Sequence, residues 1–535
     1  MIRALVVAVV VAGLGCSNPA RPCTSASCTG CCDSAGQCQR GDTSVACGSS
    51  ASACVSCGLT GSCLAGACVP VSGSGGGQAG GGLAGGGSAA GGTAGGLVDA
   101  GLSDAGLVID AGAVPDGGAP DAGARFTLID LDQTARGDST LALAVHRASG
   151  RIGVAYFAAK GTQTMAGVDD YDVKYVEVQN GVVASPQVVR TVQRRAGIAL
   201  VFDGTGQPII SYLGGAPGFE PGGPVFWFQS DAVIARRTPA WTETVLVTGG
   251  DVVTCGNPVS DRGFLVGVFP TMAFDGTGKL HLAYRDPHSA QFPMADFAGS
   301  DVEVVEDVIG TRSFQCVKPG GNDKGAWGGH LDMAIGPGLE PVLVHDKQFG
   351  GVVGVGQDVV FQRRQSTGTW TAPVTVATMS NTMSGPSVAG HTTAGVAFAV
   401  VDAAINQLQY FSNTDSMVAS TAWQRENVLS TGSSGWYPSL AFSSAGVPSI
   451  AHYQCSTRSS VPDGDCRQSE DDLRLATRTG PTWTFESIDA SGGVGPKLAF
   501  TSGDKRVIAY RVPAARLANL TVEPTAGALK LAIER

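Results

Sequence analysis

The chain reads Leu200-Val201-Phe202-Asp203-Gly204-Thr205-Gly206 and then Pro208-Ile209-Ile210-Ser211-Tyr212. This phrase returns as Met272-Ala273-Phe274-Asp275-Gly276-Thr277-Gly278, followed by Leu282-Ala283-Tyr284. Two apolar runs separated by a glycine-containing turn predict a β-hairpin. Because the phrase recurs along the chain, the sequence predicts an array of similar hairpin units.

Seven such hairpins can be recognised after residue 125, at 143–156, 199–212, 272–284, 331–345, 388–401, 440–452 and 498–510. Most are followed by a third and a fourth strand, as at 473–476 and 483–488. Four antiparallel strands repeated about every 60 residues are typical of a β-propeller blade. The sequence therefore predicts an all-β domain, a seven-bladed β-propeller, over residues 126–535.

The two ends of this domain complement each other. The seventh unit stops after a third strand at 528–533, and residues 126–130 resemble the fourth strand at 484–489. We therefore expect the N-terminal strand to complete the last blade and close the ring, which leaves no open gap between blades.

Composition narrows the function classes. Only 15% of the 535 residues are charged and 77 are glycine, which disfavours a helix-rich enzyme fold. The net charge of −10 disfavours a nucleic-acid partner, because such partners require a basic patch. Fifteen cysteines indicate an oxidising compartment.

The first 15 residues carry Arg3 and then an apolar run, which predicts a signal peptide too short to span a bilayer. The next residue, Cys16, ends Ala12-Gly13-Leu14-Gly15-Cys16, which resembles the lipobox of bacterial lipoproteins, with Gly13 where that family usually carries leucine. The other cysteines form even sets of ten and four, which leaves Cys16 unpaired. We expect Cys16 to be lipidated and to anchor the protein in the cell envelope, at the outer membrane or cell surface. The alternative is an ordinary secretory signal with Cys16 unmodified.

Residues 16–70 form a cysteine-dense module with few apolar residues, so disulfides must replace a hydrophobic core. A weaker alternative is zinc binding at Cys54-x-x-Cys57, although the module contains no histidine. The module resembles the cysteine-rich heads of myxobacterial-type surface lipoproteins, a resemblance that implies location rather than activity. Residues 71–125, rich in Gly, Ser and Ala and then in Asp-Ala-Gly repeats, predict a disordered Gly/Ala/Asp linker.

We label the strands of each blade a to d from the centre outward. The a–b turns are tight, whereas long insertions are predicted in the b–c and d–a connections, at 158–172, 214–224, 248–267, 309–329, 347–357 and 454–472. The four downstream cysteines lie in these insertions and predict disulfides Cys255–Cys316 and Cys455–Cys466. Loops displayed by a rigid scaffold carry function, so this face is the predicted binding surface.

Charged residues follow several b strands and are predicted to surround the mouth of the central channel: Arg285, Asp286, Asp346, Asp402 and Arg511. Trp327 and Trp436 are predicted to be exposed in d–a loops on the same face. Exposed aromatic rings beside charged groups suit a saccharide, whereas the structural alternative is that the charges pair with one another. His345 and His452 replace tyrosines of the b strands, and no histidine spacing indicates a metal site or a cofactor.

These observations favour an extracytoplasmic binding or adhesion module whose partner is a saccharide or an envelope or extracellular protein. One alternative is a glycoside hydrolase or lyase acting on polysaccharides, with carboxylates such as Asp286 and Asp346 converging in the channel. Tyr510-Arg511-Val512-Pro513 resembles a sialidase motif, but the repeated Asp boxes of that family are missing, and no catalytic residue can be assigned. A second alternative is a structural partner in an envelope complex.

Overall fold

The computed structural model describes two compact units, Met1–Val108 and Ile109–Arg535. In the first unit it describes residues 24, 28, 31–32, 38–39, 42–43, 46–47, 49–55, 61–64 and 67–70. In the second it describes residues 125–535 except 134–139, 166–167, 220–224, 249–265, 287–300, 319–324, 350–356, 380–384, 403–404, 406, 415–421, 430–432, 456–471, 491 and 513–527. The predicted signal peptide, Cys16 and the linker over 71–124 lie outside the described residues.

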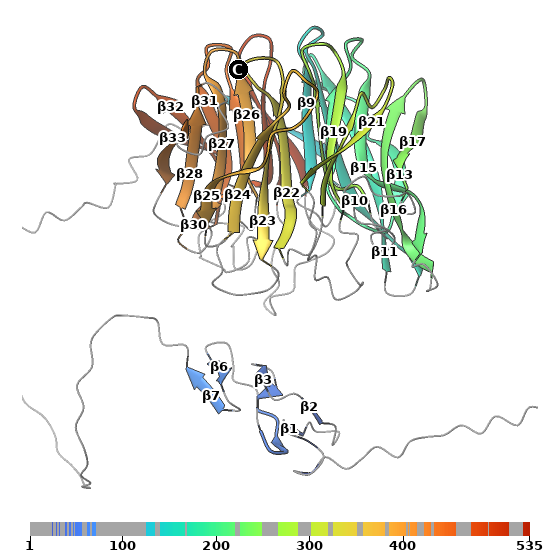
Figure 1. Cartoon of the computed structure of the whole chain (residues 1–535), viewed down its shortest axis with the longest axis vertical. Coiled ribbons are helices and arrows are strands. Elements are labelled where there is room, and N and C mark those ends of the chain that lie inside the picture. Colours follow the sequence, from blue (N-terminus) through green and yellow to red (C-terminus); the bar gives the residue numbers. More distant parts are fainter. Residues whose placement is uncertain are drawn as a thin grey trace, which may run out of the picture. The chain divides into compact units, whose positions relative to one another are not determined.

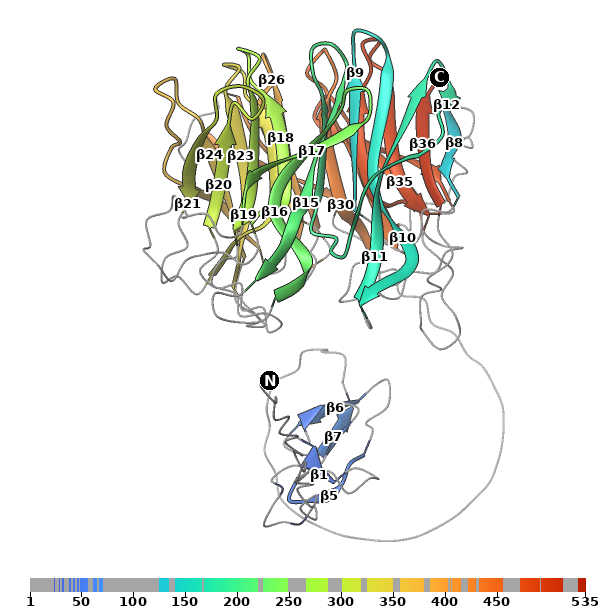
Figure 2. The same ribbon diagram turned by 90° about the vertical axis from the view of Figure 1, so that its right-hand side faces the viewer.

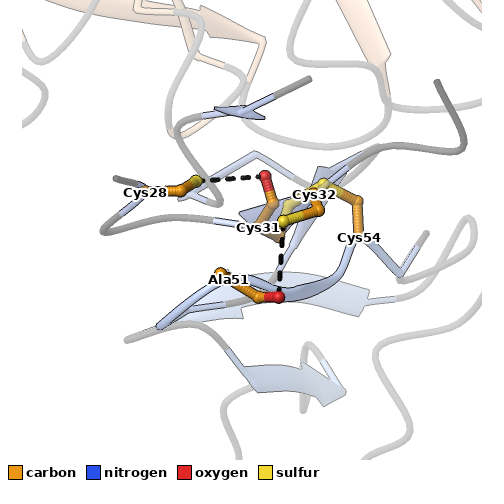
Figure 3. Close-up of a disulfide and its surroundings, with 5 residues drawn as sticks. All are labelled: Cys28, Cys31, Cys32, Ala51 and Cys54. Carbon is orange, nitrogen blue, oxygen red and sulfur yellow. Dashed lines mark hydrogen bonds between the residues drawn. A yellow bond between two sulfur atoms is a disulfide. The ribbon is translucent and has the colours of Figure 1, made fainter. Parts of the chain in front are cut away.

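The first unit contains short strands joined by disulfides. The strands are β1 (Cys31–Cys32), β2 (Cys38–Gln39), β3 (Asp42–Thr43), β4 (Ala46–Cys47), β5 (Ser52–Ala53), β6 (Gly61–Leu64) and β7 (Ala67–Pro70). A disulfide joins Cys31 of β1 to Cys54, whose Cα atoms lie 4.9 Å apart (Figure 3). Cys28, Cys32 and Cys68 are also disulfide-bonded.

This bond corrects the alternative reading of Cys54 as a zinc ligand. A metal ligand must be a thiolate, and the Cys54 sulfur is already bonded to another sulfur. Cys57 lies outside the described residues. The disulfide reading of the module is therefore the one that the described cysteines support.

The second unit is a seven-bladed β-propeller, as the sequence predicts (Figure 1). The first three blades consist of β9 (Leu141–His146), β10 (Arg151–Met165), β11 (Val168–Gln179) and β13 (Gln187–Val192), with the short β12 (Val182–Val183) beside β11; β14 (Ile198–Phe202), β15 (Pro208–Phe219), β16 (Val225–Arg237) and β17 (Trp241–Val247); and β18 (Val268–Phe274), β19 (Leu280–Asp286), β20 (Asp301–Glu306) and β21 (Ser313–Lys318). The fourth and fifth consist of β22 (Gly325–Ile335), β23 (Pro341–Phe349), β24 (Gln357–Arg363) and β25 (Val374–Met379); and β26 (Ser387–His391), β27 (Gly395–Asp402), β28 (Gln407–Asn413) and β29 (Gln424–Leu429). The sixth consists of β30 (Ser433–Phe442), β31 (Pro448–Cys455), β32 (Asp472–Thr479) and β33 (Thr482–Asp489).

The seventh blade joins the two ends of the domain. Its strands are β34 (Val494–Phe500), β35 (Arg506–Val512), β36 (Ala528–Glu534) and β8 (Phe126–Asp132), in that order. Figure 2 shows β8, the first strand of the domain, beside β36, the last. Leu531 pairs with Ile129 across this antiparallel contact, so the predicted closure is confirmed.

The hydrophobic core is divided among the junctions between blades. A cluster of buried apolar side chains lies between each blade and the next around the whole ring. The cluster between the last and the first blade packs Val507 and Leu531 against Val154. Because each junction excludes water, the ring closes through packing as well as through strand pairing.

The repeated Asp-Gly-Thr-Gly phrase forms the a–b turn. In the third blade, Asp275 Oδ1 accepts hydrogen bonds from the backbone N–H groups of Thr277 and Lys279, at 2.9 and 3.0 Å. Gly278 adopts φ +84°, a conformation that favours glycine. Asp203 makes the same bonds in the second blade. The aspartate carboxylate therefore stabilises the tight turn by accepting hydrogen bonds from the backbone N–H groups that follow it.

Several predicted insertions are in part regular strands. Residues 158–165 and 168–172 continue β10 and β11 as a paired ribbon, with Ala159 opposite Tyr171. β15 likewise extends to Phe219, which pairs with Val225. Cys316 lies in the d strand β21 rather than in a loop. No helix in the described part of the chain has the length and apolarity needed to cross a membrane.

Candidate functional site

A cavity of about 410 Å³ lies at the centre of the ring. All seven blades line it, five with residues at or just before the start of the a strand and the fourth and sixth with residues inside β22 and β30. These strand starts adjoin the d–a connections, so this part of the cavity lies on the face where the sequence predicts the binding surface. A cavity of this volume lies within the range of small-ligand sites.

Two aromatic residues line the cavity from strained backbone positions. Phe269 and Tyr437 have φ of +53° and +52°, and each is the first residue of a bulge in its a strand. Glycines with positive φ hold the equivalent position in three other blades: Gly197, Gly385 and Gly495. A left-handed conformation costs a non-glycine residue roughly 1–2 kcal/mol. Glycine would adopt this backbone conformation without strain, so the rings of Phe269 and Tyr437 are present at a cost in stability.

His330 provides a third ring in this row. Its ring centroid lies 5.8 Å from that of Phe269, and its side chain is 29% exposed. The carboxylate of Asp346 accepts the His330 backbone N–H at 2.7 Å and lies 3.0 Å from Nδ1. An ionised carboxylate can only accept, so Nδ1 carries a proton and the ring orientation is fixed.

Asp346 is fully buried behind His330, next to the charge of Arg285. Burial lowers the pKa of Arg285 to about 10, and the Asp346 charge opposes this shift. Asp286, the next residue along, is also fully buried. Neither carboxylate lines the cavity, so the predicted pair of Asp286 and Asp346 does not flank a ligand there.

A belt of side-chain hydrogen bonds links successive a strands. Its residues lie two positions after Phe269, His330 and Tyr437 along their strands. Thr271 Oγ1 accepts the backbone N–H of Met333 in the next blade at 3.0 Å. Asp332, Ser387 and Ser439 make the equivalent bond to the following blade, with N–H groups of Val388, Leu440 and Leu498. Burial raises the pKa of Asp332, against the opposing effects of Lys497 and of these hydrogen bonds.

The belt stops at three consecutive positions, Lys497, Ala142 and Ala199, on the seventh, first and second blades. Alanine has no acceptor, and the lysine ammonium can only donate. Lys497 is exposed in the cavity, as is Arg195, whose guanidinium lies 4.5 Å from the centroid of the Tyr171 ring.

Trp436 corrects one expectation. It was predicted to be exposed in a loop, but it is 1% exposed and packs with Val401, Tyr453 and Val494. The reason is its register: Trp436, in β30, pairs with Tyr453 of β31 and directly precedes the bulge. Its neighbour Tyr437 reaches the cavity instead. The side chain of Trp327 lies outside the described part of the chain.

Arg511 has a structural role. It is 4% exposed, donates to the Phe157 carbonyl of the first blade, and lies with its guanidinium 5.4 Å from the Tyr156 ring centroid. The hydroxyl of Tyr510, the other notable residue of the sialidase-like motif, donates to Asp489 at 2.6 Å. Both residues therefore hold blades together.

Asp402 lies one position beyond the b-strand position that Arg285 occupies in the third blade. Ser387 pairs with Ala399 as Thr271 pairs with Ala283, so Val401 is the equivalent of Arg285. Asp402 is 4% exposed and does not line the cavity. The sequence pattern misplaces Asp402 because the b strand of the fifth blade lacks the aromatic residue that marks this position in the other blades.

The predicted disulfides of the propeller remain predictions. Cys316 is disulfide-bonded, and its predicted partner Cys255 lies outside the described residues. Cys455 ends β31, and Cys466 also lies outside the described residues.

Within the described part of the chain, no three His, Cys, Asp or Glu side chains gather as a metal site would require.

The sequence reasoning missed the residues that line the cavity: Arg195, Phe269, His330, Asp332, Tyr437 and Lys497. A signal for three of them, Phe269, Tyr437 and Lys497, exists in the tripeptides Phe269-Pro270-Thr271, Gly385-Pro386-Ser387, Tyr437-Pro438-Ser439 and Gly495-Pro496-Lys497. Three of these tripeptides lie inside a strands and Gly385-Pro386 directly precedes one, and the residue before proline is kept out of the right-handed helical region. The row of prolines thus marks the cavity residues.

No family model matches the chain, and no curated protein matches its sequence. Solved structures do resemble it. One is a protein of unknown function from Dyadobacter fermentans, with 11% identity and a TM-score of 0.40 over 76% of this chain and 99% of that one. The NanB sialidase from Streptococcus pneumoniae has 11% identity and a TM-score of 0.40, over 76% of this chain and 70% of that one. An α-L-arabinofuranosidase from Fusarium graminearum has 12% identity and a TM-score of 0.39, over 77% and 98%. Similarity at this level assigns no residue of the site.

Proposed function

We propose that the propeller is a saccharide-binding module and that its site is the mouth of the central cavity. The observation that carries this proposal is the pair of aromatic residues at positive φ, Phe269 and Tyr437, where other blades have glycine. The apolar face of a sugar ring packs well against aromatic rings, and polar groups around them select its hydroxyls. His330, held by Asp346, offers such a polar group.

The site is built to hold its ligand without rearranging. Pro270 and Pro438 follow the two aromatic residues and restrict their backbones, while the belt of hydrogen bonds fixes the a strands beneath. A preorganised site loses less entropy when a ligand binds. This rigidity suits recognition of a saccharide presented on a surface.

The location is part of the same proposal. A lipid on Cys16 and the linker over 71–125 would display the propeller outside the cell envelope, where saccharides and extracellular proteins are accessible. Mass spectrometry of the mature N-terminal peptide tests this point: a diacylglyceryl-modified Cys16 is expected, and an unmodified or absent Cys16 would contradict it.

Glycan-array binding by the full chain tests the function. The test variant is Phe269→Gly/Tyr437→Gly, which removes both rings and installs the residue that three other blades carry at this position. We expect the wild-type chain to bind saccharides and the variant to lose that binding while remaining folded. Equal binding by both chains would place the saccharide elsewhere, and no binding by the folded wild type would favour a protein partner.

A further inference from the structure

The cavity has two chemically different halves. The third, fourth and sixth blades contribute the rings of Phe269, His330 and Tyr437. The adjoining seventh, first and second blades contribute small residues at the mouth, Gly495 and Gly197, and at the positions where the belt is interrupted, Ala142 and Ala199. The exposed side chains of Lys497 and Arg195 also come from this second half. Small side chains and positive charge therefore lie together in the half of the cavity that adjoins the rings.

Lys497 does not make the hydrogen bond of the belt. At the equivalent position, Thr271, Ser387 and Ser439 each accept a backbone N–H from the next blade. An ammonium group cannot accept, so lysine forfeits this link. Among the described residues, Lys497 forms no side-chain hydrogen bond and no ion pair. Lys497 therefore contributes a charge, and no hydrogen bond, to the wall of the cavity.

Asp332 does not neutralise Lys497 by direct pairing. Its Oδ2 accepts the Ser387 hydroxyl at 3.1 Å and the Val388 N–H at 2.8 Å, and its Oδ1 accepts the Met333 N–H at 3.0 Å. Lys497 acts on this carboxylate only through its charge at longer range. The Asp332 carboxylate is therefore committed to the belt, and the ammonium group is available to a ligand.

The charge of the cavity contrasts with that of the whole chain. The chain carries a net charge of −10, whereas the described residues that line the cavity and carry a fixed charge are Arg195, Lys497 and Asp332. Two cations and one committed carboxylate give a site that attracts anions within an acidic protein. A neutral sugar would leave the Lys497 ammonium group without a function in binding.

Building on the proposed saccharide function, we infer that the ligand is an acidic saccharide: its sugar ring packs on Phe269 and Tyr437, and its acidic group lies against Lys497 and Arg195. A carboxylate or a sulfate would satisfy this chemistry, because both accept charge-assisted hydrogen bonds. The shared feature is one negative charge on a sugar ring small enough for a cavity of about 410 Å³.

The test compares acidic and neutral glycans on one array, using the full chain and two lysine variants. Lys497→Met removes the cavity charge, and Lys505→Met makes the same change in net charge at the a–b turn of the same blade. Uronate-bearing, sulfated and uncharged oligosaccharides form separate groups, so the source of the negative charge is distinguished. The affinities for any hits are then measured by titration calorimetry at low and high salt.

We expect hits among acidic glycans, a loss of affinity of about tenfold or more for Lys497→Met, and no change for Lys505→Met. Salt should weaken wild-type binding more than binding by Lys497→Met. Binding to neutral glycans that Lys497→Met leaves unchanged would overturn the acidic ligand and leave the saccharide function intact. Failure of the folded chain to bind any glycan would overturn the saccharide function itself.

Discussion

The carboxylate of Asp332 in the fourth blade accepts the backbone N–H of Val388 in the fifth blade at 2.8 Å. The same link recurs from Thr271, Ser387 and Ser439 to the blade that follows each. The inner strands of neighbouring blades do not form a common sheet, so these side chains take the place of backbone pairing. In the third to sixth blades, the wall of the cavity is thereby held by a short side chain that accepts a hydrogen bond from the next blade.

This link predicts different effects for two substitutions of Asp332. Asp332→Ala leaves the buried Val388 N–H without its acceptor and should lower the free energy of unfolding by about 1–3 kcal/mol. Asp332→Ser restores the side chain that other blades use and should cost clearly less. Urea unfolding of both variants measures the difference. Equal losses for alanine and serine would mean that the hydrogen bond contributes little.

Closure of the ring predicts a strong dependence on Phe126. This side chain is 1% exposed and packs among Leu475, Ile508 and Tyr510. Phe126→Ala should therefore lower the free energy of unfolding by about 3–5 kcal/mol, and deletion of residues 126–131 should prevent stable folding. Leu128→Ala, an exposed position on the same strand, is the control and should change stability by less than about 0.5 kcal/mol. A stable domain after the deletion would contradict closure by β8.

The positive φ of Phe269 predicts an inversion of the usual order of small residues. Alanine normally stabilises a protein relative to glycine, but here glycine avoids the cost of the left-handed conformation. Phe269→Gly should thus be more stable than Phe269→Ala by about 1 kcal/mol. Thermal unfolding of the two variants checks this. A more stable alanine variant would show that the backbone strain at Phe269 is absent in solution.

The a–b turn of the third blade predicts a loss of stability in acid. Burial favours the protonated form of Asp275, but hydrogen bonds from His281, Thr277 and Lys279 outweigh it and lower the pKa to about 2. A carboxyl whose pKa is lowered on folding contributes stability above its unfolded pKa of about 4, and this contribution is lost as the pH falls towards 2.

Wild type should therefore exceed Asp275→Asn in stability by about 2 kcal/mol at pH 6, and by much less near pH 2.5. Urea unfolding of both proteins at the two pH values measures this. Asp504→Asn, at the a–b turn of the seventh blade, is a comparison at a partly exposed carboxylate that accepts hydrogen bonds from Ser444, where solvent screens the effect more strongly. A difference between wild type and Asp275→Asn that stays constant with pH would contradict the assignment.

The fold was largely predictable because its signal is repeated. Each hairpin carries apolar alternation and a turn, and one weak unit is supported by six others. Strand lengths were less predictable: β10 and β11 run on as a ribbon through residues that look like a loop, since only their pairing makes them strands. In the fifth blade the missing aromatic residue shifted the alignment by one position, which misplaced Asp402.

The site was much less predictable, because a β-bulge changes which side chain faces the cavity. In Trp436-Tyr437, one ring is buried and the next lines the cavity, and sequence alone favoured the tryptophan. Charged residues such as Arg285 and Arg511 suggested a charged channel mouth, yet both are buried between blades. Lys497 was overlooked because it follows a proline rather than a b strand. Only the register of the a strands brings these residues together.

The central claim concerns where a saccharide binds, and a crystal structure of the full chain with a saccharide identified on the array tests it most directly. The account predicts density for a sugar ring against Phe269 and Tyr437, with an acidic group beside Lys497 and Arg195. Density on the outer edge of the blades, with the central cavity empty of sugar, would contradict it.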